Sequence, residues 1–223
     1  LGSGDGRIVI LAAQRFGASG LGVELVPDLV RQSQDTARKA GVAERVEFRE
    51  QDIFKTDLSP ATVVTMYLLP EVNLALRPKR LQRKPGTRIV SHDWDMGDWK
   101  PDETTVVPVP DKKVGLEKSS KVHLWTVPAN VHGLWCGTGV LVGTQFAVQQ
   151  QFQNFTATMT RAGRVRDYEG RIDGDQLHSL PGARRAMQLR VLGPQLELVG
   201  GDSVFTLLKG ATLSRASGNR CDS

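Results

Sequence analysis

The chain of 223 residues contains few cysteines and no long run of apolar residues. Its two cysteines, Cys136 and Cys221, stand in no CxxC or other metal-ligand spacing, so they suggest neither a disulfide framework nor a zinc site. No stretch approaches the roughly 18 uninterrupted apolar residues of a membrane span, and no signal-peptide pattern follows residue 1. We therefore expect a globular protein located in the cytoplasm.

Runs of lysine and arginine are also absent, although the second half of the chain is basic. Residues 1–110 hold 15 lysines and arginines against 15 acidic residues, whereas residues 111–223 hold 14 against 9 and so carry the whole net charge of +5. A basic half can favour an acidic partner or a nucleic acid. These charges are scattered among turns without regular aromatic interleaving, so we do not expect nucleic-acid binding.

The first half of the sequence alternates short apolar runs with amphipathic stretches. This pattern is typical of βαβ units and a mostly parallel sheet, that is, of an α/β protein. It predicts strands at 20–25, 46–54, 61–69 and 87–95, and helices at 6–16, 27–41 and 71–84. We expect the last helix to be interrupted at Pro78, because proline removes a backbone donor and clashes with the preceding turn.

The second half of the sequence has a different pattern of residues. Residues 100–113 combine three prolines with many charges, which indicates a connector, and we divide the chain into domains 1–110 and 111–223. Beyond the connector, apolar and polar residues alternate between glycine-rich turn signals, which predicts a small antiparallel β barrel or sandwich. The alternation changes parity near Gln153 and Asn154, where we expect a β-bulge.

Three glycines stand close together in the opening segment LGSGDGRIVILAA. A glycine loop before a helix is typical of nucleotide sites, because glycines permit a tight turn and the helix N-terminus offers free N–H groups. The dinucleotide fingerprint G-x-G-x-x-G would need its third glycine at position 7, which is Arg7. Gly2, Gly4 and Gly6 instead give G-x-G-x-G, the spacing of the S-adenosylmethionine loop in class I methyltransferases.

Two acidic residues stand where a nucleoside would need them. Glu24 ends the predicted strand GLGVE, 18 positions after Gly6, where its carboxylate can accept hydrogen bonds from both ribose hydroxyls. Asp52 in EQDIF is placed to lie beside adenine, with Ile53 packing on the ring. A nicotinamide enzyme remains an alternative, because Glu24 would serve its ribose equally well.

The segments LGSGDGRIVILAA, GVELVPDLV, DIFKTDLSPATVVTMYLLPE and KPGTRIVSHDWDMGDW resemble the seven-strand class I methyltransferases. The similarity covers residues 1–100 and is greatest to the branch of the ATP-synthase c-subunit lysine methyltransferases and related bacterial proteins. It implies a Rossmann-like fold with S-adenosylmethionine as cofactor. It also implies cofactor contacts by Leu1, Gly2, Ser3, Gly4, Asp5, Gly6, Glu24, Leu25, Asp52, Ile53 and Tyr67, with Tyr67 and Leu68 at the methyl-transfer opening.

The sequence departs from that family in three respects. The membrane-associating segment of the eukaryotic lysine enzymes is not visible, and the β domain after residue 111 is not part of their core. In the family, an apolar strand ending in Asp or Glu directly precedes the glycine loop, whereas this sequence begins at Leu1. We therefore expect the first strand to be missing from residues 1–223 and to belong to a longer protein.

Candidate catalytic residues lie near the ends of the last two predicted strands of the first half. Methyl transfer from a sulfonium is an in-line displacement that needs alignment and exclusion of water. An amine acceptor must also be neutral, which a carboxylate or a tyrosine could promote. The candidates are Tyr67, Asp93 and Asp95, and strand alternation would turn both aspartates to one face and His92 and Trp94 to the other.

These patterns predict a methyltransferase that uses S-adenosylmethionine, with a protein lysine as the first-choice acceptor. A small-molecule acceptor is the first alternative, and a buried aromatic pocket around Trp94 and Trp99 would favour it. A non-catalytic module that binds S-adenosylmethionine or mediates an interaction is the second, and binding without turnover would identify it. We expect the β domain to help recognise the substrate or to close over the site.

Overall fold

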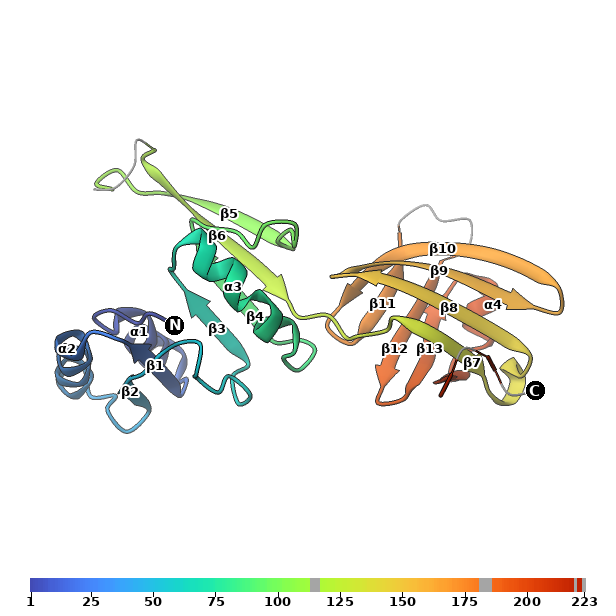
Figure 1. Cartoon of the computed structure of the whole chain (residues 1–223), viewed down its shortest axis with the longest axis horizontal. Helices are drawn as coiled ribbons and strands as arrows, with labels where there is room; N and C mark the ends of the chain where they lie inside the picture. The colour runs from blue at the N-terminus through green and yellow to red at the C-terminus, as the bar shows by residue number, and fades with distance from the viewer. Residues whose placement is uncertain (113–116, 181–185, 219, 222–223) are drawn as a thin grey trace. The chain divides into compact units, whose positions relative to one another are not determined.

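The computed structural model describes residues 1–112, 117–180, 186–218 and 220–221, except for the side chain of Arg80. The chain forms two compact units, each drawn in Figure 1. The first comprises Leu1–Arg83 and Arg88–Trp125, and the second comprises Lys84–Thr87 and Thr126–Ser223. The division therefore falls after Trp125, later than the boundary that we expect after residue 110.

The first unit alternates strands and helices in the expected chain order. Its elements are α1 (Arg7–Phe16), β1 (Gly20–Glu24), α2 (Pro27–Lys39), β2 (Val46–Glu50), β3 (Val63–Met66), α3 (Pro70–Leu81), β4 (Arg88–His92), β5 (Glu103–Pro108) and β6 (Ser119–Thr126). β1 pairs with β2 in parallel, and a second sheet has the mixed order β3-β4-β6-β5. Within that sheet β3 and β4 are parallel, whereas β5 and β6 are antiparallel.

Two amphipathic helices pack against the β1–β2 pair. α1 buries Ile10 and Ala13, while α2 buries Val30, Ser33 and Ala37, which lie on one face at spacings of three and four residues. Their apolar members join the buried side chains of β2 in one core cluster. This packing fixes the ends of β1 and β2 and the start of α1, where the glycine loop lies.

The structure corrects two sequence predictions for α3 and β2. α3 continues through Pro78, because Pro78 and the residue one turn earlier, Leu74, are exposed and water can solvate the carbonyl that proline leaves unpaired. β2 ends at Glu50 and not at residue 54. Asp52 bends the chain there by accepting a hydrogen bond from the amide of Phe54 (2.8 Å).

The stretch 100–113, expected to be a connector, instead contains β5; of that stretch, Lys113 lies outside the described residues. The β-branched residues from Thr104 to Val107 favour an extended strand. β5 is the edge strand of its sheet, and an edge strand tolerates a proline such as Pro108 because one side needs no backbone donor. The hairpin of β5 and β6 thereby belongs to the first unit.

The second unit is a closed antiparallel barrel of eight strands that follow one another in chain order, with β14 pairing back to β7 (Figure 1). Its elements are β7 (Gly133–Gly137), η1 (Gly139–Leu141), β8 (Thr144–Gln151), β9 (Asn154–Arg161), β10 (Arg164–Asp173), β11 (Gln176–Ser179), β12 (Met187–Leu192), β13 (Gln195–Gly201), α4 (Ser203–Leu207) and β14 (Thr212–Arg215). Alternate residues along the strands point inward and form one apolar core.

Two features of the barrel correct the sequence predictions. The parity change near Gln153 marks the turn between β8 and β9, where Phe152 has a left-handed backbone (φ 53°), and is not a bulge. Residues 203–207 form the helix α4, although their alternation of polar and apolar residues predicts a strand. Asp202 caps this helix by accepting hydrogen bonds from the amides of Val204 (3.0 Å) and Phe205 (3.2 Å).

Cys136 and Cys221 form a disulfide, which contradicts the expectation from their spacing. The two residues are 85 positions apart in sequence, but their Cα atoms lie 5.5 Å apart. Pairing of β14 with β7 places Ser214 opposite Cys136 and so carries the following segment back to β7. Contacts of this range follow from barrel closure and leave no trace in the local sequence.

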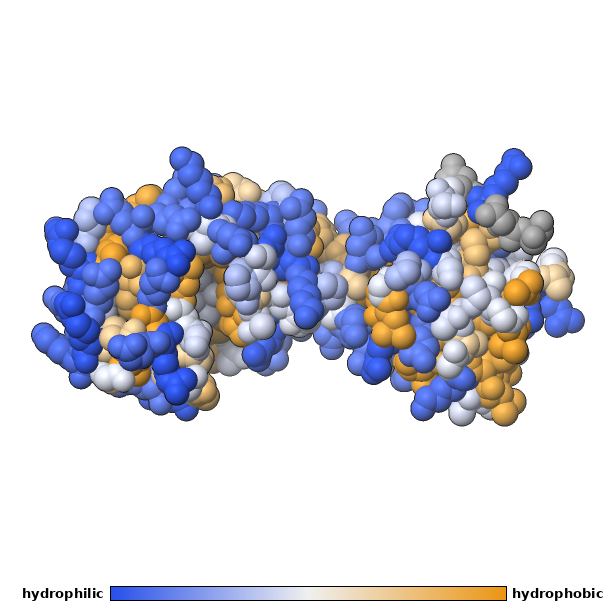
Figure 2. Space-filling view, turned by 90° about the horizontal axis from the view of Figure 1, so that it is seen from below, coloured by the Kyte–Doolittle hydropathy of each residue, from blue (hydrophilic) through white to orange (hydrophobic). Residues whose placement is uncertain are grey.

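Polar side chains cover most of the face shown in Figure 2, with apolar areas on both units. Phe16 and Leu207 are the most exposed large apolar side chains of the described residues. No helix in the described parts of the chain is long and apolar enough to cross a membrane.

Candidate cofactor-binding site

The three glycines of the opening loop all have left-handed backbone, with φ values of 59° at Gly2, 54° at Gly4 and 77° at Gly6. A Cβ atom at Gly6 would lie 2.7 Å from the ring of Phe48, and one at Gly2 would lie 2.8 Å from Leu68 Cδ2. At Gly4, no atom lies within 4 Å of the corresponding point. Gly2 and Gly6 therefore permit close packing, whereas Gly4 faces open space.

The loop is attached to the strands on both of its sides. The backbone nitrogen of Leu1 donates to the carbonyl of Thr65 in β3 (2.8 Å), and the amide of Ser3 donates to the carbonyl of Val23 in β1 (2.9 Å). The loop therefore lies between the ends of β1 and β3, where parallel α/β sheets bind ligands.

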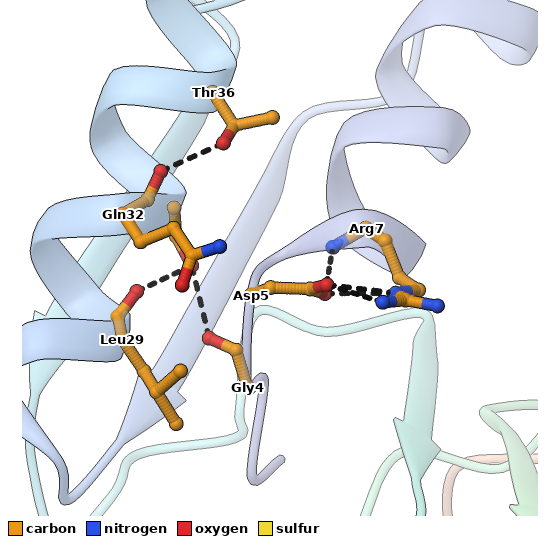
Figure 3. Close-up of polar contacts among 7 residues, drawn as sticks. Gly4, Asp5, Arg7, Leu29, Gln32 and Thr36 are labelled. Carbon is orange, nitrogen blue, oxygen red and sulfur yellow. Dashed lines mark hydrogen bonds and ion pairs between the residues drawn. The ribbon is translucent and has the colours of Figure 1, made fainter.

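Figure 3 shows how the middle of the loop is held. The carbonyl of Gly4 points to α2. There the hydroxyl of Ser33 lies 3.0 Å from this carbonyl and 2.8 Å from that of Leu29, and its single proton is shared between the two. Asp5 turns to the start of α1, where Arg7 Nε donates to both of its carboxylate oxygens (2.9 Å). Hydrogen bonding from Arg7 holds the pKa of Asp5 below its ordinary value.

Glu24, at the end of β1, holds this loop in place by hydrogen bonds. Its Oε2 accepts a hydrogen bond from the amide of Gly4 (3.0 Å), and its Oε1 accepts from the amides of Leu25 (2.8 Å) and Val26 (3.2 Å). An ionised carboxylate has about four acceptor positions, so these bonds leave about one for a ligand. The carboxylate can therefore take a ribose hydroxyl without releasing the loop, and bonds from both ribose hydroxyls stay a prediction.

Asp52 and Ile53 lie at the same sheet edge as Glu24. The parallel register of β1 and β2 places Glu24 opposite Glu50, and the amide of Gln51 donates to the carbonyl of Glu24 (3.0 Å). Asp52 and Ile53 follow directly in a turn, and both are half-buried. A polar and an apolar side chain thus stand next to the position of Glu24, as a nucleoside site requires.

The other side of the loop carries an aromatic pair. Tyr67 follows β3 and is half exposed, and its ring meets the imidazole of His92 at the end of β4 edge to face, with ring centroids 4.2 Å apart. The parallel register of these strands, Met66 opposite Ser91, explains the contact. Tyr67 therefore stands at the sheet edge that holds the loop.

Asp93 is tied to neighbouring segments of the first unit. Its Oδ2 accepts from Lys112 Nζ (2.8 Å), and its Oδ1 accepts from the amide of Lys121 in β6 (2.8 Å). Burial opposes ionisation, but the bonds from Lys112 and Lys121 and the charge of His92 outweigh it and lower the pKa of Asp93. These contacts give the carboxylate a structural role in attaching the β5–β6 hairpin.

The polar stretch after β4 is a turn, so the expected strand alternation there is wrong. β4 ends at His92, and Asp93 has a left-handed backbone (φ 62°). The carbonyl of Trp94 accepts hydrogen bonds from Ser91 Oγ (2.6 Å) and from Nδ2 of the buried Asn73 (3.3 Å). Asn73 shapes this turn and is missed by the sequence analysis, since its one visible signal is an amide side chain inside a helix.

The two tryptophans of this stretch do not form a shared pocket. Trp99 is fully buried and packs against Trp125, with ring centroids 6.1 Å apart, whereas Trp94 is 43% exposed. Asp95 is also exposed, and its Oδ1 accepts a hydrogen bond from the amide of Gly97 (3.0 Å). The aromatic pocket that would favour a small-molecule acceptor is therefore not built from Trp94 and Trp99.

The residues of this edge fit S-adenosylmethionine. Ser3 Oγ is buried and has no hydrogen-bond partner in the described residues, so it can serve a polar group of a ligand beside the open space at Gly4. Glu24 can hold a ribose hydroxyl, and Asp52 with Ile53 can meet adenine. Within the described parts of the chain, no cluster of three or more His, Cys, Asp or Glu side chains could hold a metal ion.

Comparison with known proteins agrees with this geometry. Residues 1–103 match the family model of the ANTKMT methyltransferase domain. A protein-lysine N-methyltransferase from Saccharolobus islandicus is 43% identical over 109 residues, which cover 48% of this chain and 68% of that protein. The ATP synthase c-subunit lysine N-methyltransferase of Mus musculus is 36% identical over 106 residues, covering 47% of this chain and 42% of that protein.

One solved methyltransferase structure is also similar to this chain. The RNA methyltransferase from Salinibacter ruber, crystallised in complex with S-adenosyl-L-homocysteine, is 53% identical with a TM-score of 0.51, and the match covers 58% of this chain and 79% of that chain. The loop geometry and the extent of these matches lead to one conclusion. The chain belongs to the ANTKMT methyltransferase domain family of S-adenosylmethionine-dependent methyltransferases.

Proposed function

We propose that the first unit transfers the methyl group of S-adenosylmethionine to the ε-amino group of a lysine in a protein. The observation that carries this proposal is the 43% identity to a protein named as a protein-lysine N-methyltransferase, over 68% of its length. The match to the mouse enzyme, also named for a lysine acceptor, supports it, although this chain spans only 42% of that enzyme.

The exposure of side chains near the site favours a large acceptor. Tyr67, Leu69 and Trp94 are 50%, 59% and 43% exposed. A small-molecule acceptor is usually enclosed by apolar and aromatic side chains, and Trp99, which could have contributed, is buried against Trp125. An open edge with exposed apolar side chains suits a lysine presented on the surface of another protein.

Methyl transfer forms a bond between the lysine nitrogen and the methyl carbon while the bond from that carbon to sulfur breaks. When bound, S-adenosylmethionine supplies the electrophilic methyl group. The loop and Glu24 would orient the cofactor, and Tyr67 with His92 would line the approach of the lysine. The ε-amine, with an ordinary pKa of about 10.4, must lose its proton before it can attack.

Tyr67 is the best placed of the three catalytic candidates. It stands at the strand edge beside His92, whereas the carboxylate of Asp93 is bound to Lys112 and that of Asp95 accepts from a neighbouring backbone amide. We therefore propose that Tyr67 lines the opening where the lysine nitrogen meets the methyl group. A catalytic role for Asp93 or Asp95 stays a prediction.

An RNA acceptor is the second candidate, because the structural relative from Salinibacter ruber is named as an RNA methyltransferase. Binding of RNA depends on neutralising phosphates with lysine and arginine. The candidate site instead presents carboxylates at the ends of its strands, among them Glu24, Asp52 and Asp95. This charge disfavours RNA at that edge and supports the protein acceptor.

A labelling experiment decides between the acceptors. The chain is incubated with S-adenosylmethionine tritiated on the methyl group and with a protein mixture, total RNA or a metabolite extract. We expect label in the proteins, recovered as methyl-lysine after hydrolysis and lost when the lysines are first acetylated. Label in nuclease-sensitive material would establish RNA as the acceptor, label in metabolites a small molecule. Binding of S-adenosylhomocysteine without any transfer would support the non-catalytic module.

A further inference from the structure

The barrel of the second unit contains a cavity of about 350 Å³. Its wall includes Met159, Met187, Leu189, Leu198, Phe205 and Leu213, which come from β9, β12, β13, α4 and β14. Protein interiors normally leave few voids larger than a water molecule. An eight-stranded barrel can instead hold one small ligand, and this volume lies within the range of about 300 to 1,000 Å³ of small-molecule sites.

A hydroxyl group without a partner lies in the wall of this cavity. Thr144 begins β8 and is 2% exposed, and its Oγ1 makes no hydrogen bond to any described residue. A buried hydroxyl that loses its bonds to water without a replacement is destabilising, so such groups are rare in finished cores. The Thr144 hydroxyl is therefore available to a polar group inside the cavity.

Three arginines line the cavity next to this hydroxyl. Arg161 ends β9, and Arg164 and Arg166 follow in β10 after a two-residue turn. In the barrel register Arg161 lies opposite Thr144 on one side and opposite Arg164 on the other. The three guanidinium groups and the Thr144 hydroxyl thus belong to one end of the barrel.

Strand alternation turns all three arginines to the inside. Along β10 the buried residues Tyr168 and Ile172 share the parity of Arg164 and Arg166, and along β9 the buried Phe155 shares the parity of Arg161. All three arginines are exposed at their position on the strands, and none takes part in an ion pair within the described residues. Like charges on opposed positions repel each other unless an anion lies between them.

We propose that the barrel binds a small amphiphilic anion, a carboxylate with an unbranched alkyl chain. The alkyl chain occupies the apolar cavity between Met187, Leu189 and Leu198. The carboxylate lies at the barrel end, accepts a hydrogen bond from Thr144 Oγ1 and pairs with Arg164 and Arg166. This arrangement places the charge where solvent and guanidinium groups stabilise it, and removes the apolar chain from water.

Calorimetric titration of the whole chain with hexanoate, octanoate and decanoate below their micellar concentrations tests the proposal. Each methylene group that enters the cavity should tighten binding about fourfold until the cavity is filled. Decanol and decylamine have the same chain without the negative charge and should bind at least tenfold more weakly than decanoate. Raised salt should weaken the binding of decanoate, because the arginines are solvent-accessible.

Matched variants locate the anion. Arg164→Ala and Arg166→Ala should each weaken decanoate binding about tenfold, and Thr144→Val should weaken decanoate more than decanol. Arg190→Ala is the control, because Arg190 is exposed on the outward parity of β12, and it should change the affinity less than twofold. Circular dichroism of each variant checks that the barrel is folded.

Three outcomes would overturn the proposal. They are no heat of binding for any of the alkanoates, binding of decanol or decylamine as tight as that of decanoate, and a loss in Arg190→Ala equal to that in Arg164→Ala. Because the ligand contacts only the second unit, none of these results bears on methyl transfer by the first.

Discussion

Alanine substitutions at Gly4, Gly6 and Gly17 separate the contribution of the glycine loop to folding from its contribution to binding. The three residues share a left-handed backbone, with φ values of 54°, 77° and 64°. This conformation costs a residue with a Cβ atom about 1 to 2 kcal/mol. Each variant should therefore lose about that much free energy of unfolding from the backbone alone.

Gly6→Ala should lose more, because the new methyl group would meet packed atoms. Its Cβ would lie 2.7 Å from the ring of Phe48 and 2.9 Å from Ser33 Cβ, whereas nothing lies within 4 Å of a Cβ at Gly4 or Gly17. Overpacking of a core costs about 1 to 3 kcal/mol. The expected loss is therefore about 2 to 5 kcal/mol for Gly6→Ala and about 1 to 2 kcal/mol for the other two variants.

The affinity for the cofactor should rank the three variants in a different order from their stability. The methyl group of Gly4→Ala would enter the open space in front of the loop, where the cofactor must approach the backbone. The same steric cost of about 1 to 3 kcal/mol then appears as a loss of affinity of roughly 5-fold to 150-fold. Gly17 ends α1 at the opposite end from the loop, so Gly17→Ala should bind S-adenosylhomocysteine as the unsubstituted chain does.

Hydrogen exchange measured by mass spectrometry on peptides from α1 and β1 reports the local stability, and exchange quickens about tenfold for each 1.4 kcal/mol lost. Calorimetry with S-adenosylhomocysteine reports the affinity. The reasoning is refuted if Gly6→Ala exchanges no faster than Gly17→Ala, or if Gly4→Ala binds the ligand as tightly as Gly17→Ala does.

Three further predictions concern other parts of the chain. Replacing Cys136 by Ser opens a loop that spans 85 positions and should destabilise the barrel by about 4 to 5 kcal/mol, measured by calorimetric unfolding; a barrel equally stable with and without reductant would refute this estimate. Asp93→Asn should cost about 1 to 3 kcal/mol at pH 7 through the lost bond to Lys112; since the pKa of Asp93 is lowered from 3.8, its contribution is present above that pH and is lost as the pH falls below it, so the difference in urea unfolding between wild type and variant should shrink on acidification. Tyr67→Ala should lower the methyl-transfer rate at least tenfold, and an unchanged rate would remove Tyr67 from the opening.

The sequence predicts the parts of the fold and site that depend on local spacing. The predicted helices at 6–16 and 27–41 correspond to α1 and α2 within two residues at each end, because their apolar faces repeat with the helical period. The spacing from Gly6 to Glu24 indicates a loop and a carboxylate at one sheet edge, and the bond from the amide of Gly4 to Glu24 brings them together.

Features that depend on distant partners cannot be predicted in this way. Asp93 stands in a polar turn that resembles a catalytic cluster, but its carboxylate meets Lys121 because β6 lies next to β4 in the sheet, and Lys112 because the β5–β6 hairpin carries it there. The prolines of residues 100–113 suggest a connector because an isolated segment with prolines rarely forms a central strand. At the edge of a sheet this objection does not apply.

Strand alternation predicts which face of the barrel the arginines of the β9–β10 hairpin occupy. The periodicity of apolar residues, considered alone, leaves these charged residues out. In the segment MTRAGRVRDY the apolar and turn residues predict strands, and the arginines taken singly resemble solvated charge. Extending the parity of Phe155 and Met159 by one step reaches Arg161, and extending that of Tyr168 backward reaches Arg166 and Arg164. A charged residue on the interior parity of a barrel strand is costly unless it lies at an open end or meets an opposite charge. Three of them at one end therefore agree with the open, anion-binding barrel end that we propose.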